Sequence, residues 1–106
     1  MVTTLAGSGT RGYKDATGTE AQFDHPTSVA LDASGNVYVA DTCNNLIRKI
    51  TSEGVETTLA GSSQGYKDAT GTEAQFAAPT DVAVDSDGNV YVADSFKSLI
   101  RKMEYK

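Results

Sequence analysis

Short runs of alternating and β-branched apolar residues, each bounded by turn residues, recur along the whole chain. Such runs between Gly, Asn, Asp and Ser clusters are typical of β-strands. The sequences "ASGN" and "SDGN" between runs supply the glycine and the polar residues of tight hairpin turns. No segment has a helical apolar period long enough to predict a helix. The expected strands are residues 27–32, 37–41, 46–50, 55–61, 80–85, 90–94 and 99–103.

Both faces of these strands are apolar. Val37 and Val39 lie on one face of their strand, and Tyr38 and Ala40 lie on the other. A sheet that meets water on one side would instead alternate apolar with polar residues. The pattern therefore predicts antiparallel sheets of four strands, each packed between two further layers.

A repeat explains the order of these strands. The segment "GYKDATGTEAQF" occurs unchanged at residues 12–23 and 65–76, and the residues that follow align at a constant offset of 53. Upstream, "TTLAGS" recurs at an offset of 54, so one residue is deleted in the intervening loop. A period of this length is typical of repeat folds in which one unit forms one propeller blade. We expect two units, at about residues 1–53 and 54–106.

The repeated units resemble a known family. The strings "HPTSVALDASGNVYVADTCNNLIRKI" and "APTDVAVDSDGNVYVADSFKSLIRKM" are similar to NHL repeats in their prolines, their "GNVYVAD" segment and their "IRK" strand. The resemblance covers essentially the whole chain. It implies an all-β fold of propeller blades, and NHL propellers usually have six blades rather than two.

The strand order is circularly permuted. The chain begins with the outermost strand of a blade, Val2–Gly7, and ends after a third strand, so the second blade lacks its fourth. Head-to-tail contact between copies would supply the missing strand by donation and would cover the apolar blade faces. We expect a closed ring made by a homotrimer with six blades, or alternatively by a homotetramer with eight.

Ligand binding is expected on the face built by the long loops and the loops between the second and third strands. In the long loop, Ala21 and Phe23 are spaced to anchor the loop on the blade, which leaves a polar, aromatic tip. The candidate binding residues are Tyr13, Lys14, Asp15, His25, Asn44, Asn45, Tyr66, Lys67, Asp68, Phe96 and Lys97.

No catalytic constellation is evident in the sequence. His25 is the single histidine, and the second unit has Ala78 in its place. A nucleophile needs a base within hydrogen-bond reach. We therefore expect a non-catalytic scaffold or binding module with no cofactor and no bound transition metal. The alternative is a propeller lyase or hydrolase that holds a metal in the central channel.

Three structural roles are also predicted. Cys43 should be a free surface thiol without a basic neighbour. Asp41 and Asp94, at the ends of the "VAD" strands, should accept N–H groups of the following turn. The basic residues of the third strands should be solvated charges that protect an outer strand; these are Arg48, Lys49, Arg101 and Lys102.

The net charge of the chain limits the classes of partner that we expect. The 106 residues carry a formal net charge of −5, which argues against nucleic acid and anionic membrane surfaces as partners. The first ten residues resemble no signal peptide, and no apolar run approaches the roughly 20 residues of a membrane span. We expect a soluble chain, and its compartment is not indicated.

Overall fold

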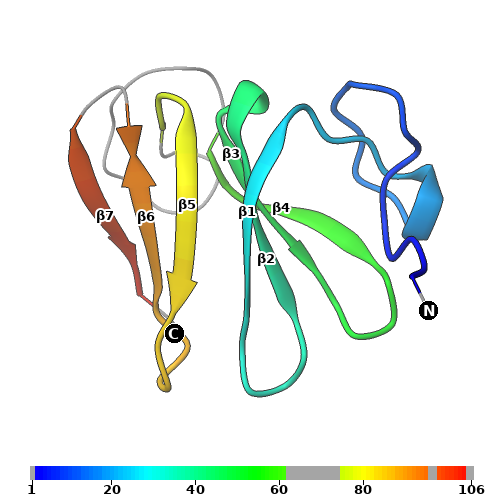
Figure 1. The fold of residues 1–106 in the computed structure, drawn as a ribbon. Helices are drawn as coiled ribbons and strands as arrows, with labels where there is room; N and C mark the ends of the chain where they lie inside the picture. Colours follow the sequence, from blue (N-terminus) through cyan, green and yellow to red (C-terminus); the bar gives the residue numbers. More distant parts are fainter. Residues whose placement is uncertain (1, 62–74, 96–97, 105–106) are drawn as a thin grey trace.

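The computed structural model describes residues 2–61, 75–95 and 98–104, which form two antiparallel sheets (Figure 1). Blade 1 has four strands in chain order, and blade 2 has three. The strands of blade 1 are β1 (Pro26–Leu31), β2 (Val37–Asp41), β3 (Leu46–Ile50) and β4 (Glu56–Gly61). Those of blade 2 are β5 (Pro79–Val84), β6 (Val90–Asp94) and β7 (Leu99–Met103). Among the described residues, 3₁₀ turns include η1 (Gly18–Glu20) and η2 (Thr42–Asn44). The predicted meanders and the seven strands expected within them are confirmed.

The register assigns each side chain to a face. Val29 lies opposite Val39, Val39 opposite Arg48, and Arg48 opposite Thr58. Residues directly opposite each other point to the same side of a sheet. One face of blade 1 therefore carries a valine pair on its inner strands and an arginine on its third strand.

An aspartate closes each β-hairpin between the first two strands. Asp32 accepts hydrogen bonds from the N–H groups of Ser34 and Asn36 at 2.9 and 3.0 Å and from the Tyr38 hydroxyl at 2.9 Å. Gly35, at a φ of 85°, provides the left-handed residue of this turn. Asp85 makes the corresponding bonds in blade 2. The expected role of the "SDGN" segment as a hairpin turn is confirmed.

The main core lies between the two blades. Side chains from β2, β3 and β4 meet side chains from β5 and β6, and Phe76, 2% exposed, packs among them. The buried members of this cluster are Tyr38, Ala40, Ile47, Ala60, Phe76, Val82, Val90 and Val92. Each blade therefore uses one apolar face to cover its neighbour, as the two-sided pattern predicts.

Part of each of the other two faces is exposed in the single chain. Val29 and Leu31 on β1 are 59% and 62% exposed, whereas Val82, which aligns with Val29, is 5% exposed. On the far side of blade 2, Ile100 is 76% exposed, whereas the aligned Ile47 is fully buried. We call these surfaces the free face of blade 1 and the free face of blade 2.

The N-terminal segment forms no strand within this chain. Residues 2–5 lack regular secondary structure, and Val2 and Leu5 are 97% and 53% exposed. The segment lies on the side of blade 1 that faces away from blade 2 (Figure 1). Its expected pairing with a neighbouring chain stays a prediction. None of the helical turns among the described residues is long or apolar enough to cross a membrane.

The Asp32 turn should make stability sensitive to acid. Hydrogen bonds from Asn36, and then from Tyr38 and Ser34, lower the pKa of Asp32 from 3.8 to about 2. A lowered folded-state pKa stabilises the fold above pH 3.8, and this contribution is lost as the pH falls toward 2. We expect Asp32→Asn to reduce the loss of stability between pH 4 and 2 in urea unfolding. An identical pH profile for the variant and the unmodified chain would contradict this role.

Candidate functional site on the loop face

The first long loop, residues 12–23, folds back on blade 1 rather than extending into solvent. Lys14 and Gln22 exchange both backbone hydrogen bonds, at 3.3 and 3.0 Å, so that the loop forms a small hairpin. The N–H of Gly18 then donates to the Gly54 carbonyl at 2.9 Å, and the N–H of Glu56 donates to the Ala16 carbonyl at 2.9 Å. These bonds fix the loop against the β3–β4 hairpin.

A buried arginine holds this loop from below. Arg48 is fully buried, and its five N–H groups all have acceptors. Nε donates to Glu56 at 2.6 Å, and Nη1 donates to Asp41 at 2.7 Å and to the Gln22 carbonyl at 2.5 Å. Nη2 donates to the Lys14 carbonyl at 2.8 Å and to Asp15 at 3.0 Å. One guanidinium therefore joins three strands of blade 1 to both arms of the loop.

Two aromatic rings enclose the same guanidinium. Its Cζ atom lies 5.1 Å from the centre of the Tyr13 ring and 4.6 Å from that of Phe23. Both distances are within the range of cation–π contacts. The expected anchoring of the loop by Phe23 is thus explained by contact with a charge as well as by apolar burial.

Blade 2 repeats the central part of this arrangement. Arg101 is 8% exposed and donates to Asp94 at 2.7 Å and to the Gln75 carbonyl at 2.7 Å. Its guanidinium lies 4.8 Å from the centre of the Phe76 ring. The prediction that Arg48 and Arg101 are solvated charges is wrong, because the pleat turns both toward the face that the loops cover. Lys102, on the opposite face, is exposed.

The strand-end aspartates also have other partners than predicted. Asp41 is fully buried, and it accepts the N–H of Asp24 at 2.7 Å and two side-chain donors, Arg48 at 2.7 Å and Asn44 at 2.8 Å. The prediction that it caps the backbone of the following turn is wrong. Its backbone donor comes from the segment before β1 because the loop folds back over the sheet. Asp94 likewise accepts the Ala77 N–H at 2.7 Å.

Three carboxylates surround the single Arg48 charge, and the pKa values of two of them, Glu56 and Asp15, are shifted in opposite directions. Burial is the largest influence on Glu56, and together with the neighbouring Asp15 it raises the pKa of Glu56 to about 7 in spite of the Arg48 bond. Burial would also raise the pKa of Asp15, but hydrogen bonds from Glu56, Thr58 and Arg48 outweigh it and lower that pKa. Protonation of Glu56 near neutral pH reduces the excess negative charge of the buried cluster.

Most of the described candidate residues are engaged in holding the fold. The hydroxyls of Tyr13 and Thr58 are 3.1 Å apart, and Thr58 donates to Asp15 at 2.9 Å. Asn44 donates to the Gly12 carbonyl at 2.9 Å, and Asn45 accepts the Ala78 N–H of blade 2 at 2.8 Å. These amides tie the long loop and the second blade to η2.

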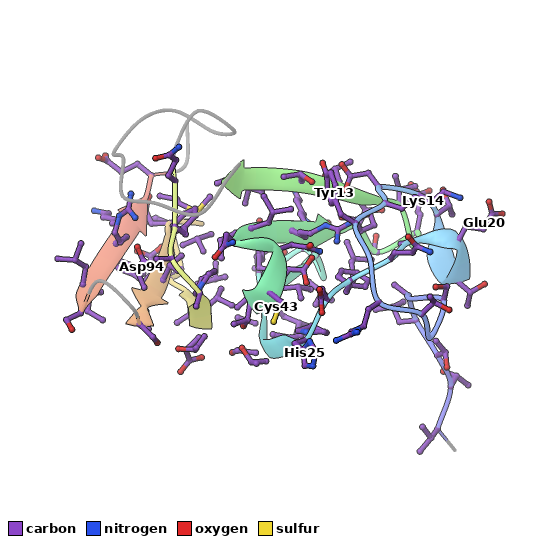
Figure 2. All side chains as sticks on the ribbon, turned by 90° about the horizontal axis from the view of Figure 1, so that it is seen from above. Tyr13, Lys14, Glu20, His25, Cys43 and Asp94 are labelled. Carbon is purple, nitrogen blue, oxygen red and sulfur yellow. The ribbon has the colours of Figure 1, made fainter. Side chains whose placement is uncertain are left out.

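Lys14 and His25 remain exposed on the surface. Figure 2 shows His25 close to Cys43 and apart from Tyr13 and Lys14, so the candidates form two groups and not one cluster. The prediction that Cys43 is a free, exposed thiol is confirmed. The prediction that it has no basic neighbour is wrong, because His25 lies beside it. The remaining candidates fall outside the described residues: Tyr66, Lys67, Asp68, Phe96 and Lys97.

Removing the Arg48 guanidinium should destabilise blade 1 strongly. In Arg48→Met the surrounding carboxylates lose their positive partner, and breaking a buried ion pair on one side typically costs about 3–5 kcal/mol. Lys49→Met is the matched control, because it also removes one positive charge from β3, and it should cost about 1 kcal/mol or less. Urea unfolding of both variants measures the difference. Equal losses would show that Arg48 is not the anchor described.

The Glu56 carboxyl should make the fold less stable as the pH rises toward neutrality. Its folded-state pKa of about 7 exceeds its ordinary value of 4.5, so the folded chain binds more protons between these values. Stability that is present below pH 4.5 is then lost as the pH rises through 7, by on the order of 3 kcal/mol. Glu56→Gln, an uncharged isostere, should remove this decline in unfolding experiments between pH 4.5 and 8. A decline that persists unchanged in the variant would refute the assignment.

Comparison with known proteins agrees with this geometry. The family model described as NHL repeat matches residues 23–50 and 76–102. The chain is 35% identical over 97 residues to Protein SUPPRESSOR OF QUENCHING 1, chloroplastic, of Arabidopsis thaliana, and this match covers 88% of the chain but 9% of that protein.

Solved structures give the same result. A structural genomics protein of unknown function from Bacteroides thetaiotaomicron superposes with a TM-score of 0.86 at 28% identity, over 93% of this chain and 26% of that one. An auxiliary nutrient binding protein from Bacteroides ovatus gives 0.75 at 25% identity, over 90% of this chain and 26% of that one. The chain therefore spans about a quarter of each solved neighbour. With two matched repeats, each folded as a propeller-type blade around a buried arginine, the chain belongs to the NHL-repeat family.

Proposed function

We propose that this chain is a self-assembling, non-catalytic propeller module, in which copies join head to tail into a closed ring that binds ligands on its loop face. The observation that carries the proposal is the repeat relation between buried and exposed apolar residues. Val82 and Ile47 are buried at the junction between the blades, and their aligned partners Val29 and Ile100 are exposed on the two free faces. The free faces thus carry the complementary halves of a junction that the chain already makes once.

The polar contacts of the junction could also be repeated between copies. Within the chain, the Thr27 hydroxyl donates to the Thr80 carbonyl at 2.9 Å, and the Thr42 hydroxyl donates to the Pro79 carbonyl at 2.6 Å. At the positions aligned with Thr27 and Thr42, the second repeat has Thr80 and Ser95, which retain the hydroxyls. Blade 2 of one copy would therefore offer the same hydroxyl donors to blade 1 of the next copy.

The sheet edges support head-to-tail contact as well. Blade 2 has no fourth strand among the described residues, whereas the sequence of Val2–Gly7 aligns with that of β4. This segment lies beside the free face of blade 1, where the blade 2 of a neighbour would dock (Figure 1). It could then pair with the neighbour's β7 and complete that blade. Three copies would close a six-bladed ring, and four would close an eight-bladed one.

Binding rather than catalysis fits the exposed loop surface. Tyr13 is 56% exposed and Lys14 lies beside it, so the loop presents an aromatic ring and an amino group. The similarity to an auxiliary nutrient binding protein supports a binding role in general terms. The acidic residues of the loop site are committed to Arg48, so they are poorly placed to act as an acid–base pair.

Two complementary variants test the assembly. Val29→Asp and Ile100→Asp each place a charge on one free face, at residues that the single chain leaves exposed. Fully burying a Val or Ile side chain is worth about 1.5–3 kcal/mol, and a buried unpaired charge adds to that loss. Each variant alone should be folded and unable to form a ring. Mixed together, the two should form a heterodimer, because each retains the face that the other lacks.

Ser34→Asp is the matched control. It adds the same charge at a turn where the second repeat already has Asp87, and it should leave the ring intact. Light scattering on each variant and on the mixture gives the result. Rings that survive both face variants, or a mixture in which no heterodimer forms, would overturn the proposed junction.

A further inference from the structure

The two repeats differ at three positions that come together in space. Asp24, His25 and Cys43 belong to the first repeat, and the aligned positions of the second repeat hold alanine, alanine and phenylalanine. Asp24 and His25 precede β1, whereas Cys43 lies on η2 after β2. One donor atom from each of the three side chains lies within 4.8 Å of the other two.

Backbone hydrogen bonds fix this juxtaposition. The N–H of Cys43 donates to the carbonyl of Asp24 at 3.1 Å, which places the thiol beside the two residues before β1. The N–H of Asp24 is in turn held by the buried carboxylate of Asp41 at 2.7 Å. His25 Nδ1 lies 2.6 Å from the Asp24 carboxylate. The three donors therefore project from a backbone that the sheet holds in place.

We propose that Asp24, His25 and Cys43 form a binding site for Zn²⁺ on the surface of blade 1. A thiolate, an imidazole nitrogen and a carboxylate oxygen are the ligand types that Zn²⁺ prefers in proteins, and three protein ligands leave the fourth position for water. Tetrahedral Zn²⁺ places its donors about 3.5 Å apart, and the three donor atoms here lie within 4.8 Å of one another. Thiolate and carboxylate together also neutralise the charge of the ion.

This proposal departs from the expectation that the chain binds no transition metal, which rested on His25 having no counterpart in the second repeat. The lack of a counterpart excludes a histidine on every blade but not a chelate within one blade. The inference does not depend on ring assembly, since all three donors come from one chain.

The second repeat shows that alanine is compatible with the fold at two of the three positions. His25 has a φ of 55° and Ala78 has a φ of 53°, so the same left-handed backbone accepts alanine. The N–H of Ala77 donates to its strand-end aspartate at 2.7 Å, the same distance as for Asp24. Asp24→Ala and His25→Ala should therefore remove ligands without disturbing the blade.

The test is titration of the full chain, kept reduced, with Zn²⁺ in a calorimeter and with Co²⁺ in a spectrophotometer. We expect one ion per chain and a thiolate-to-cobalt absorption band that disappears in Cys43→Ser. Asp24→Ala and His25→Ala should each weaken Zn²⁺ binding at least ~10-fold. Glu20→Gln, which removes an exposed carboxylate elsewhere on the same loop, should leave the affinity unchanged.

Two outcomes would overturn the proposal. One is the lack of saturable Zn²⁺ binding by the unmodified chain. The other is that His25→Ala and Cys43→Ser both bind Zn²⁺ as strongly as the unmodified chain does, which would assign the ion to the acidic surface in general. Circular dichroism of each variant, compared with the unmodified chain, confirms that a lost site is not a lost fold.

Discussion

Each blade of this fold is apolar on both faces, and this constraint governs most of the structure. A blade cannot be stable with both faces in water, because burial of apolar surface is the main favourable contribution to folding. The chain meets the constraint once, where blade 1 covers blade 2 through Ile47 and Val82. The same requirement at the two free faces is the reason that we propose further copies of the chain as the covering layers.

The buried guanidinium of Arg48 meets a second requirement, which arises because a long polar loop packs against a sheet. A loop packed on a blade brings backbone carbonyls that need donors, and unpaired buried carbonyls are costly. Arg48 donates to two of them and simultaneously to three carboxylates. Because Arg101 repeats the contact to a strand-end aspartate and to a loop carbonyl, this clamp is a property of the repeat and not of one blade.

Local patterns predicted the strands well, and contacts distant in sequence account for what was missed. The β-branched runs and the Gly-containing turns specify β1 to β7 because both act over a few residues. The burial of Arg48 depends on a loop some 30 residues away in the sequence, whose return to β3 no local pattern predicts. The proximity of Cys43 to His25 similarly depends on one backbone bond between Cys43 and Asp24. The sequence did hold one usable signal for the proposed metal site. Ala77 and Ala78 replace Asp24 and His25 directly before the first strand of the second repeat.

Ring assembly requires that the apolar junction inside the chain is made again between copies. The most direct measurement is the molar mass of the unmodified chain in solution, by light scattering or sedimentation equilibrium at micromolar concentration. We expect one species of three times the chain mass, or four times if eight blades close the ring. A folded monomer or dimer at that concentration would contradict it.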